Sequence, residues 1–290
     1  MLKRKISIAE NTEETNKQIK VENNNEGNIV TSQYFQNIPK VEETIADQLL
    51  QLQRELNNSL NGLNLKTGPV EYVYNPLLYA FDPYEKYIRK YCTSTKELLF
   101  IGMNPGPFGM CQTGIPFGDP ICVRQFLQIE GIVNKPEVEC PSRIITGFGS
   151  SRREISGKRL WEFFENLCGS PEKFFENALL LNFCPIALMK SNGSNVTPAD
   201  IKDIKVRKSL EAACNNWYLE VIKLIKPKFI VAVGGYIDKK TKELFKANNI
   251  DDIQILCMPH PSPRSVGNQN WHEKAQKFID DNNLIGYFQA

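Results

Sequence analysis

The chain lacks several features that whole protein classes require. None of its eight cysteines stands in a Cys-x-x-Cys pair, the spacing typical of zinc and iron–sulfur sites. No run of about 18 apolar residues is present, so no membrane role is expected. The net charge is only +2, so any contact with nucleic acid must be local. Most cysteines are expected to be small buried hydrophobes, although Cys111, Cys122 and Cys140 could in principle share a metal.

Residues 1–42 differ in composition from the rest of the chain. They are rich in Asn, Glu, Lys and Thr and poor in aromatic residues, a composition that cannot bury enough surface to fold alone. A disordered tail is therefore predicted. Lys3-Arg4-Lys5 is not followed by the apolar run of a secretory signal. It could be a weak nuclear-import patch or only a solvated start of the chain. We expect a nuclear protein with a single catalytic domain at residues 43–290.

Apolar runs that alternate with helical patterns predict the fold class. Four short runs rich in branched and aromatic residues indicate buried strands, at residues 97–103, 178–184, 228–234 and 253–258. An amphipathic helix is predicted at the start of the domain, at residues 43–60. Further helices are predicted between the strands, at residues 158–168, 207–226 and 236–247. This order predicts an α/β protein with three layers, α/β/α, around a central, mainly parallel four-stranded sheet.

Polar side chains follow three of the expected strands. Asn104 lies in a Gly- and Pro-rich loop after the first strand, Asn182 ends the second, and His260 follows the fourth. In an open parallel sheet, ligands bind beyond the carboxyl ends of the strands. These three side chains are therefore predicted to meet at one site.

Two long segments resemble the signature motifs of a known family. Residues 102–118 read GMNPGPFGMCQTGIPFG and residues 260–264 read HPSPR, and both resemble the motifs of the single-strand-selective monofunctional uracil-DNA glycosylases. The resemblance continues over further segments, so it covers nearly everything beyond the tail: residues 70–92, 154–168, 182–185 and the helix at Trp271. It implies the uracil-DNA glycosylase version of the α/β/α fold, with no cofactor and no metal.

The resemblance implies a role for each matching residue. Asn104 resembles the residue that positions the hydrolytic water, and His260 resembles the histidine that steadies charge on the departing base. Phe117 resembles the aromatic residue on which the flipped pyrimidine stacks. Asn182 resembles the amide that binds the uracil edge. These four residues are the predicted centre of the site.

The resemblance also implies pocket and DNA contacts. Gly106 and Met110 would line the pocket, and the missing side chain of Gly106 would leave room for 5-substituted uracils such as 5-hydroxymethyluracil. Residues 261–270 resemble the family's wedge, although Ser265 replaces the usual Asn-Pro start after Arg264. The expected DNA-binding residues are Pro261, Ser262, Pro263, Arg264, Ser265, Val266, Gly267, Asn268, Gln269 and Asn270. A further cluster could bind phosphates or simply form a solvated face: Arg143, Arg152, Arg153, Lys158 and Arg159.

The chemistry of base removal fits these residue types. Cleavage of the N-glycosidic bond leaves an anionic pyrimidine and an electron-poor sugar, so a catalyst needs donors aimed at the base and a placed water. The amide of Asn104 cannot act as a general base as a carboxylate would. We therefore expect it mainly to orient the water rather than to take a proton from it. No lysine stands at the catalytic positions, so hydrolysis without strand cleavage is expected. We expect a monomer that acts on uracil or modified uracil in single- and double-stranded DNA.

Two other functions remain open. The loop at residues 102–109 could cradle a phosphate in a nucleotide-handling α/β enzyme, although the Lys and Ser/Thr of a P-loop are missing. The domain could instead bind damaged DNA without acting on it. The presence of both Asn104 and His260 argues against this second alternative.

Overall fold

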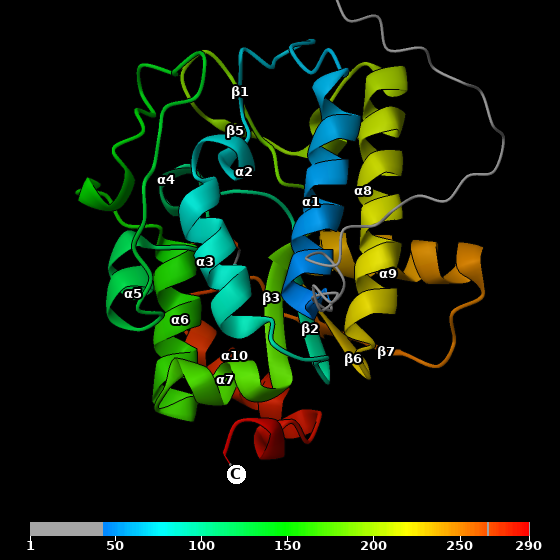
Figure 1. Cartoon of the computed structure of the whole chain (residues 1–290). Helices are drawn as coiled ribbons and strands as arrows, with labels where there is room; N and C mark the ends of the chain where they lie inside the picture. Colours follow the sequence, from blue (N-terminus) through cyan, green and yellow to red (C-terminus); the bar gives the residue numbers. More distant parts are fainter. Residues whose placement is uncertain (1–42, 266, 290) are drawn as a thin grey trace, which may run out of the picture. The chain divides into compact units, whose positions relative to one another are not determined.

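The computed structural model describes residues 43–265 and 267–289 (Figure 1). The predicted tail at residues 1–42, including its basic patch, lies outside the described residues, as does Val266. The α-helices are α1 (Ile45–Asn61), α2 (Pro76–Tyr79), α3 (Phe81–Tyr91), α4 (Met110–Thr113), α5 (Pro120–Gln125), α6 (Ile155–Cys168), α7 (Pro171–Asn177), α8 (Ile204–Ile225), α9 (Gly235–Asn248) and α10 (Trp271–Asp281).

Four parallel strands form the central sheet. They are β2 (Leu98–Gly102), β3 (Ala178–Asn182), β6 (Phe229–Val233) and β7 (Gln254–Met258), in the order β3-β2-β6-β7. The register pairs Gly102 with Asn182 and Val233 with Met258, so the carboxyl ends of the strands align at one edge. All residues of β2 and β3 are buried, which is why both appear in the sequence as continuous apolar runs.

Helices cover both faces of this sheet (Figure 1). The connection from β2 to β3 steps across the sheet in one direction, and the connection from β3 to β6 steps back in the other. Right-handed crossovers therefore place α6 and α8 on opposite faces. Helix α1 packs against α8 and α3, while α10 packs against α6. The predicted three-layer α/β/α fold is confirmed.

The first helix begins where the sequence provides a cap. Thr44 Oγ1 accepts a hydrogen bond from the Asp47 N–H at 3.1 Å, and the Asp47 carboxylate accepts one from the Thr44 N–H, also at 3.1 Å. This capping box satisfies two backbone donors at the start of α1. Leu49, Leu56 and Leu60 then form part of its buried face, as the amphipathic spacing predicts.

A second, smaller sheet is not apparent in the sequence. It consists of β1 (Tyr72–Tyr74), β4 (Ala187–Met189) and β5 (Asn195–Val196), which pair antiparallel in the order β1-β4-β5. Strands of two or three residues are too short for a periodic pattern. The sheet packs with Cys111 and Cys140 in a separate small core.

The described part of the chain bears on two classes of protein, those that bind a metal and those that span a membrane. It contains no group of three or more His, Cys, Asp or Glu residues that could hold a metal, so the alternative of a metal shared by Cys111, Cys122 and Cys140 is not supported. Among the residues that the structure describes, no helix combines the length and the apolar character needed to cross a membrane.

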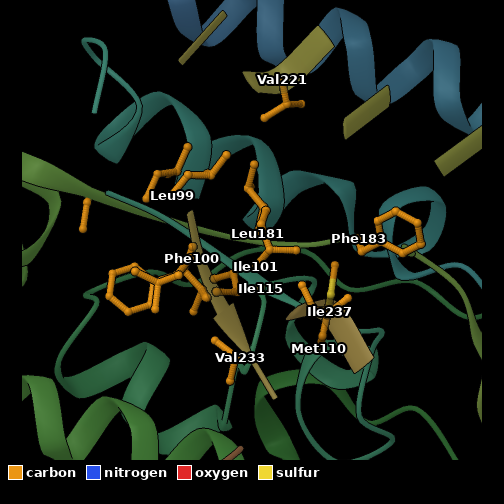
Figure 2. Packing of buried hydrophobic residues seen from close by; sticks show 14 of the residues in the cluster. Leu99, Phe100, Ile101, Met110, Ile115, Leu181, Phe183, Val221, Val233 and Ile237 are labelled. Atoms are coloured by element: carbon orange, nitrogen blue, oxygen red, sulfur yellow. The ribbon is translucent and has the colours of Figure 1, made fainter. Parts of the chain in front are cut away.

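The main core is rich in aromatic rings. The Phe100 ring of β2 lies 5.5 Å from the Phe164 ring of α6 and 5.6 Å from the Phe174 ring of α7, measured between centroids. Figure 2 shows Ile101 of β2 and Leu181 of β3 among the buried side chains. This packing fixes the strands whose ends carry the polar residues.

Truncation of the core should destabilise the whole sheet. Replacing the fully buried Phe174 with alanine is expected to lower the free energy of unfolding by about 3–5 kcal/mol, because the lost ring leaves a cavity. Urea unfolding followed by circular dichroism measures this change. The control Ile132→Ala, at a side chain that is 70% exposed, should change it by less than about 0.5 kcal/mol. Equal losses in the two variants would contradict the packing described here.

Candidate active site

The loop after β2 is held by hydrogen bonds that continue the sheet. The N–H groups of Phe183 and Cys184 donate to the carbonyl oxygens of Gly102 and Met103, both at 2.9 Å. The first residues of the loop therefore have a fixed path. Asn104 follows directly, and its Nδ2 lies 3.5 Å from Oδ1 of Asn195.

A cavity of about 350 Å³ opens at the carboxyl edge of the sheet. Asn104 and Gly106 of the first motif line it together with His260 and Arg264 of the second motif. Residues 152–156 and Asn195 contribute to the rest of its wall. The two motifs, far apart in the sequence, thus face one another across a single space.

Phe117, Asn182 and Met110 lie outside the cavity lining, and the first two pack around Gly102. A Cβ at Gly102 would lie 2.3 Å from Asn182 Oδ1 and 2.6 Å from Phe117 Cε2, so only glycine fits there. The Phe117 ring is 5.8 Å from the His260 ring, which connects this group to the cavity. The structure therefore brings the predicted central residues together, with Asn104 and His260 in the wall and Phe117 and Asn182 beside Gly102.

Phe117 has a left-handed backbone conformation, with φ of 51°. A bulky residue rarely adopts this conformation, so the surroundings must impose it. The Asp119 N–H donates to the Phe117 carbonyl at 2.8 Å. Gly157 of α6 packs so closely that a Cβ there would lie 2.1 Å from the same oxygen. Strained backbone of this kind is typical of functional sites, and the sequence contains no signal for it.

A buried ion pair fixes the position of this segment. The Asp119 side chain is fully buried and accepts hydrogen bonds from Arg153 Nε, shared between Oδ1 at 2.8 Å and Oδ2 at 2.9 Å, and from Arg153 Nη2 to Oδ2 at 2.6 Å. It also accepts the backbone N–H of Glu154 at 3.0 Å and that of Cys122 at 3.2 Å. Burial acts to raise the pKa of Asp119, but the hydrogen bonds from Arg153 and Cys122 outweigh it and hold the pKa below its usual range. The Phe117 segment is thereby tied to the start of α6.

Glu154 is a residue of the cavity wall that the sequence analysis does not single out. A Cβ at Gly106 would lie 2.5 Å from Glu154 Oε2, and one at Gly109 would lie 2.8 Å from Glu154 Cγ. The Phe108 N–H donates to Oε2 at 3.4 Å. Burial raises the pKa of the Glu154 carboxyl. The room beside Gly106 is therefore filled by this carboxyl rather than left empty.

His260 is held as a neutral ring with one free donor. The Ser262 N–H donates to its Nδ1 at 3.1 Å, so Nδ1 is the acceptor and the proton of the neutral ring belongs on Nε2. Nε2 has no hydrogen-bond partner among residues 43–265 and 267–289. Burial lowers the pKa of His260 to about 4, which keeps the ring uncharged near neutral pH.

The segment after His260 is supported by the body of the protein. Asn268 is buried, and its Nδ2 donates to the carbonyl oxygens of His260 and Ser262 at 2.8 and 2.7 Å. Arg159 Nη1 donates to the carbonyls of Pro261 and Asn268 at 3.3 and 3.1 Å. The expectation that Pro261 and Asn268 contact DNA is therefore not supported, because both are buried and Asn268 holds the loop.

The exposed part of the predicted DNA-binding segment is shorter than the sequence suggests. Ser262 is half-buried and lines the cavity. Val266 lies outside the described residues. The exposed members are Pro263, Arg264, Ser265, Gly267, Gln269 and Asn270. A wedge built from this segment would thus use its outer half.

The half-buried, neutral His260 should make the protein less stable in acid. The pKa of His260 is about 4 in the folded protein against an ordinary value of 6.5, so between these values the unfolded chain binds the proton more readily. The free energy of unfolding therefore falls as the pH falls through this window, by about 2 kcal/mol between pH 7.5 and pH 5 from this group. Urea unfolding of the wild type and of His260→Asn at both pH values isolates the effect. Identical pH dependence in the two proteins would contradict a neutral ring with a lowered pKa.

Known proteins match both the sequence and the fold of this chain. The model of the uracil DNA glycosylase superfamily matches residues 89–283. The single-strand selective monofunctional uracil DNA glycosylase of Bos taurus is 37% identical over 243 residues, covering 83% of this chain and 88% of that protein. That of Rattus norvegicus is also 37% identical over 243 residues, covering 83% and 86%. The crystal structure of SMUG2 from Pedobacter heparinus has the same fold, with a TM-score of 0.56 at 21% identity over 83% of this chain and 99% of that one. The resemblance seen in the motifs is confirmed, and the chain belongs to the uracil DNA glycosylase superfamily.

Proposed function

We propose that this protein is a monofunctional DNA glycosylase that hydrolyses the N-glycosidic bond of uracil in DNA and leaves an abasic site. The observation that carries the proposal is the shared cavity of Asn104 and a neutral His260 with a free Nε2–H. Membership of a superfamily of uracil-DNA glycosylases supports the same reaction class.

His260 stabilises the leaving base. As the glycosidic bond breaks, negative charge develops on the pyrimidine oxygens, and a donor already aimed at that charge lowers the barrier. Because the pKa of His260 is about 4, the ring donates a hydrogen bond from Nε2 without being charged in the resting enzyme. Asn104 positions the water that attacks the sugar carbon. One water is consumed: its oxygen bonds to the sugar carbon, the base leaves with the electron pair of the broken glycosidic bond, and the proton released by the water neutralises the departing anion through the solvent.

Asn182 distinguishes uracil from cytosine. Its Oδ1 is buried and has no hydrogen-bond partner among the described residues, and its Nδ2 donates to the Met110 sulfur, a weak acceptor, at 3.1 Å. The amide can therefore accept from N3–H of uracil and donate to O4. Cytosine presents an amino group in place of O4, which leaves two donors opposed. The neighbouring Phe117 ring provides the surface on which the base stacks.

The base must leave the DNA stack to reach the buried Asn182 and the half-buried Phe117 and His260. Flipping costs a few kcal/mol, which an inserted side chain and stacking of the base offset. Arg264 is exposed at the rim of the cavity and is the side chain proposed to enter the vacated position. The substrate is single- or double-stranded DNA, and the protein acts as a monomer in base-excision repair in the nucleus.

5-Substituted uracils, including 5-hydroxymethyluracil, complete the proposed range of substrates. The Glu154 carboxyl fills the room beside Gly106, so a substituent on this side meets a polar group rather than an empty space. A hydroxymethyl group can form a hydrogen bond there, whereas a methyl group cannot.

Removal of either catalytic side chain tests the reaction directly. Asn104→Ala and His260→Ala are each expected to slow single-turnover release of uracil by about 100- to 1,000-fold, because each removes a group that acts at the reacting bond. Quantifying free base from a uracil-containing oligonucleotide measures the rate. Lys246→Ala, an exposed position remote from the motifs in sequence, is the matched control. Wild-type protein that binds the oligonucleotide but releases no base would indicate a damage-binding module instead.

The selectivity argument makes a separate prediction for Asn182. Wild-type protein should release uracil at least about 1,000-fold faster than cytosine, since a mismatched pair of donors is strongly unfavourable in a buried site. Asn182→Ala should slow uracil release and narrow this ratio. Two oligonucleotides that differ only in this base provide the measurement. A ratio that survives the substitution would remove Asn182 from base discrimination.

A further inference from the structure

The basic residues between positions 143 and 159 fall into two groups in the structure. Arg153 is paired with the buried Asp119, Arg159 donates to loop carbonyls, and Lys158 Nζ lies 3.7 Å from Glu162 Oε1. These three cationic side chains therefore already have partners within the protein. Arg143 and Arg152, by contrast, have no carboxylate within 4.0 Å in the part of the chain that the structure describes.

The two unpaired arginines converge on one aromatic ring. The Arg152 Cζ lies 4.1 Å from the centroid of the Phe108 ring, and the Arg143 Cζ lies 5.0 Å from it. A guanidinium over an aromatic face is attracted by the ring, and its N–H edge stays free to bind another group. Phe108 belongs to the first motif, whose loop carries Asn104. The ring therefore fixes two cations relative to the catalytic loop.

The arrangement has unused donor capacity. Arg143 Nη1 donates to the Ser142 carbonyl at 2.6 Å, but its buried Nε has no hydrogen-bond partner among the described residues. Two like charges brought to one ring repel each other, and an anion placed between or beside them removes that cost. Both side chains line the 350 Å³ cavity that also contains Asn104 and His260. An anion bound here would lie beside whatever occupies the active site.

We propose that Arg143 and Arg152, held against Phe108, bind backbone phosphates of the DNA strand whose nucleotide enters the cavity. The inference rests on the proposed function, since it names the strand that the cavity takes. Arginine forks match phosphate oxygens in a bidentate geometry, and such contacts fix the register of the strand without reading its sequence. The phosphate contacts anchor the strand at the cavity and so contribute to the affinity for DNA, while His260 and Asn104 act on the glycosidic bond.

The salt dependence of binding separates phosphate contacts from other effects. Each lost contact with single-stranded DNA should reduce the slope of log K against log salt by about 0.7. Arg143→Gln and Arg152→Gln should each show this reduction, and the double variant should show about twice as much. Fluorescence anisotropy with a single-stranded oligonucleotide that carries a non-cleavable abasic analogue gives K without turnover. Lys246→Gln, an exposed lysine, is the matched control and should leave the slope unchanged.

Kinetics and the aromatic platform provide a second readout. In both arginine variants the KM for a uracil-containing single strand should rise, while the single-turnover rate at saturating enzyme stays within about twofold of the wild type, because the bond-breaking groups are untouched. Phe108→Leu keeps both charges but removes the ring that orients them. Because the ring acts through the arginines that it orients, Phe108→Leu should weaken DNA binding less in the Arg152→Gln background than in the wild type. A double-mutant cycle measures this non-additivity.

The outcomes distinguish this inference from the proposed function. Unchanged slopes in both arginine variants, together with normal release of uracil, would overturn the phosphate contacts and leave the glycosylase intact. An equal reduction in Lys246→Gln would also overturn them, since it would indicate diffuse charge rather than a built contact. Wild-type protein that releases no uracil would instead overturn the proposed function, whatever the slopes.

Discussion

The ion pair between Asp119 and Arg153 is the contact on which the geometry of the site depends. Asp119 follows the strained Phe117 by two residues, and Arg153 immediately precedes Glu154. One pair therefore fixes both the end of the first motif and the carboxyl that packs beside Gly106. The Asp119 carboxylate is fully buried and satisfied by the guanidinium and two backbone N–H groups. A buried pair of this kind adds little net stability over an apolar contact, because desolvation opposes it. Its contribution is positional: it allows a left-handed phenylalanine to persist beside His260.

Much of the fold follows from simple sequence patterns, for physical reasons. β2 and β3 are buried along their whole length, so each appears as an unbroken apolar run, and the long helices α6, α8 and α9 show helical spacing. Four strands alternating with helices have few right-handed arrangements, so the three-layer architecture could be predicted. The antiparallel sheet of β1, β4 and β5 could not be predicted, because its strands hold two or three residues each and the β1–β4 pairing joins segments over 100 residues apart.

The position of the candidate site could be predicted where polar side chains follow the ends of strands. Asn104 and His260 stand immediately beyond the carboxyl ends of parallel strands, which the sequence reveals directly. Asp119 and Glu154 were missed because each is a single acid whose partners are distant in sequence, and Glu154 reads as one charge among several arginines. In the segment after His260, the sequence does not distinguish exposed residues from residues that support the loop. Asn268 looks like an exposed loop residue, but its amide joins the loop to itself, a fact that depends on three-dimensional closure.

The pairing of Gly102 with Asn182 in the central sheet has a consequence for how the site is assembled. The amide proposed to bind the base and the loop proposed to place the water leave adjacent strands at the same level, and the ladder continues through Phe183 and Cys184. These groups have no separate ordering step, because their spacing is set when the sheet forms. Backbone amides of Phe183 and Cys184 should therefore exchange with solvent only on the timescale of global unfolding. In every folded molecule the distance between the base-binding amide and the water-binding loop is already fixed.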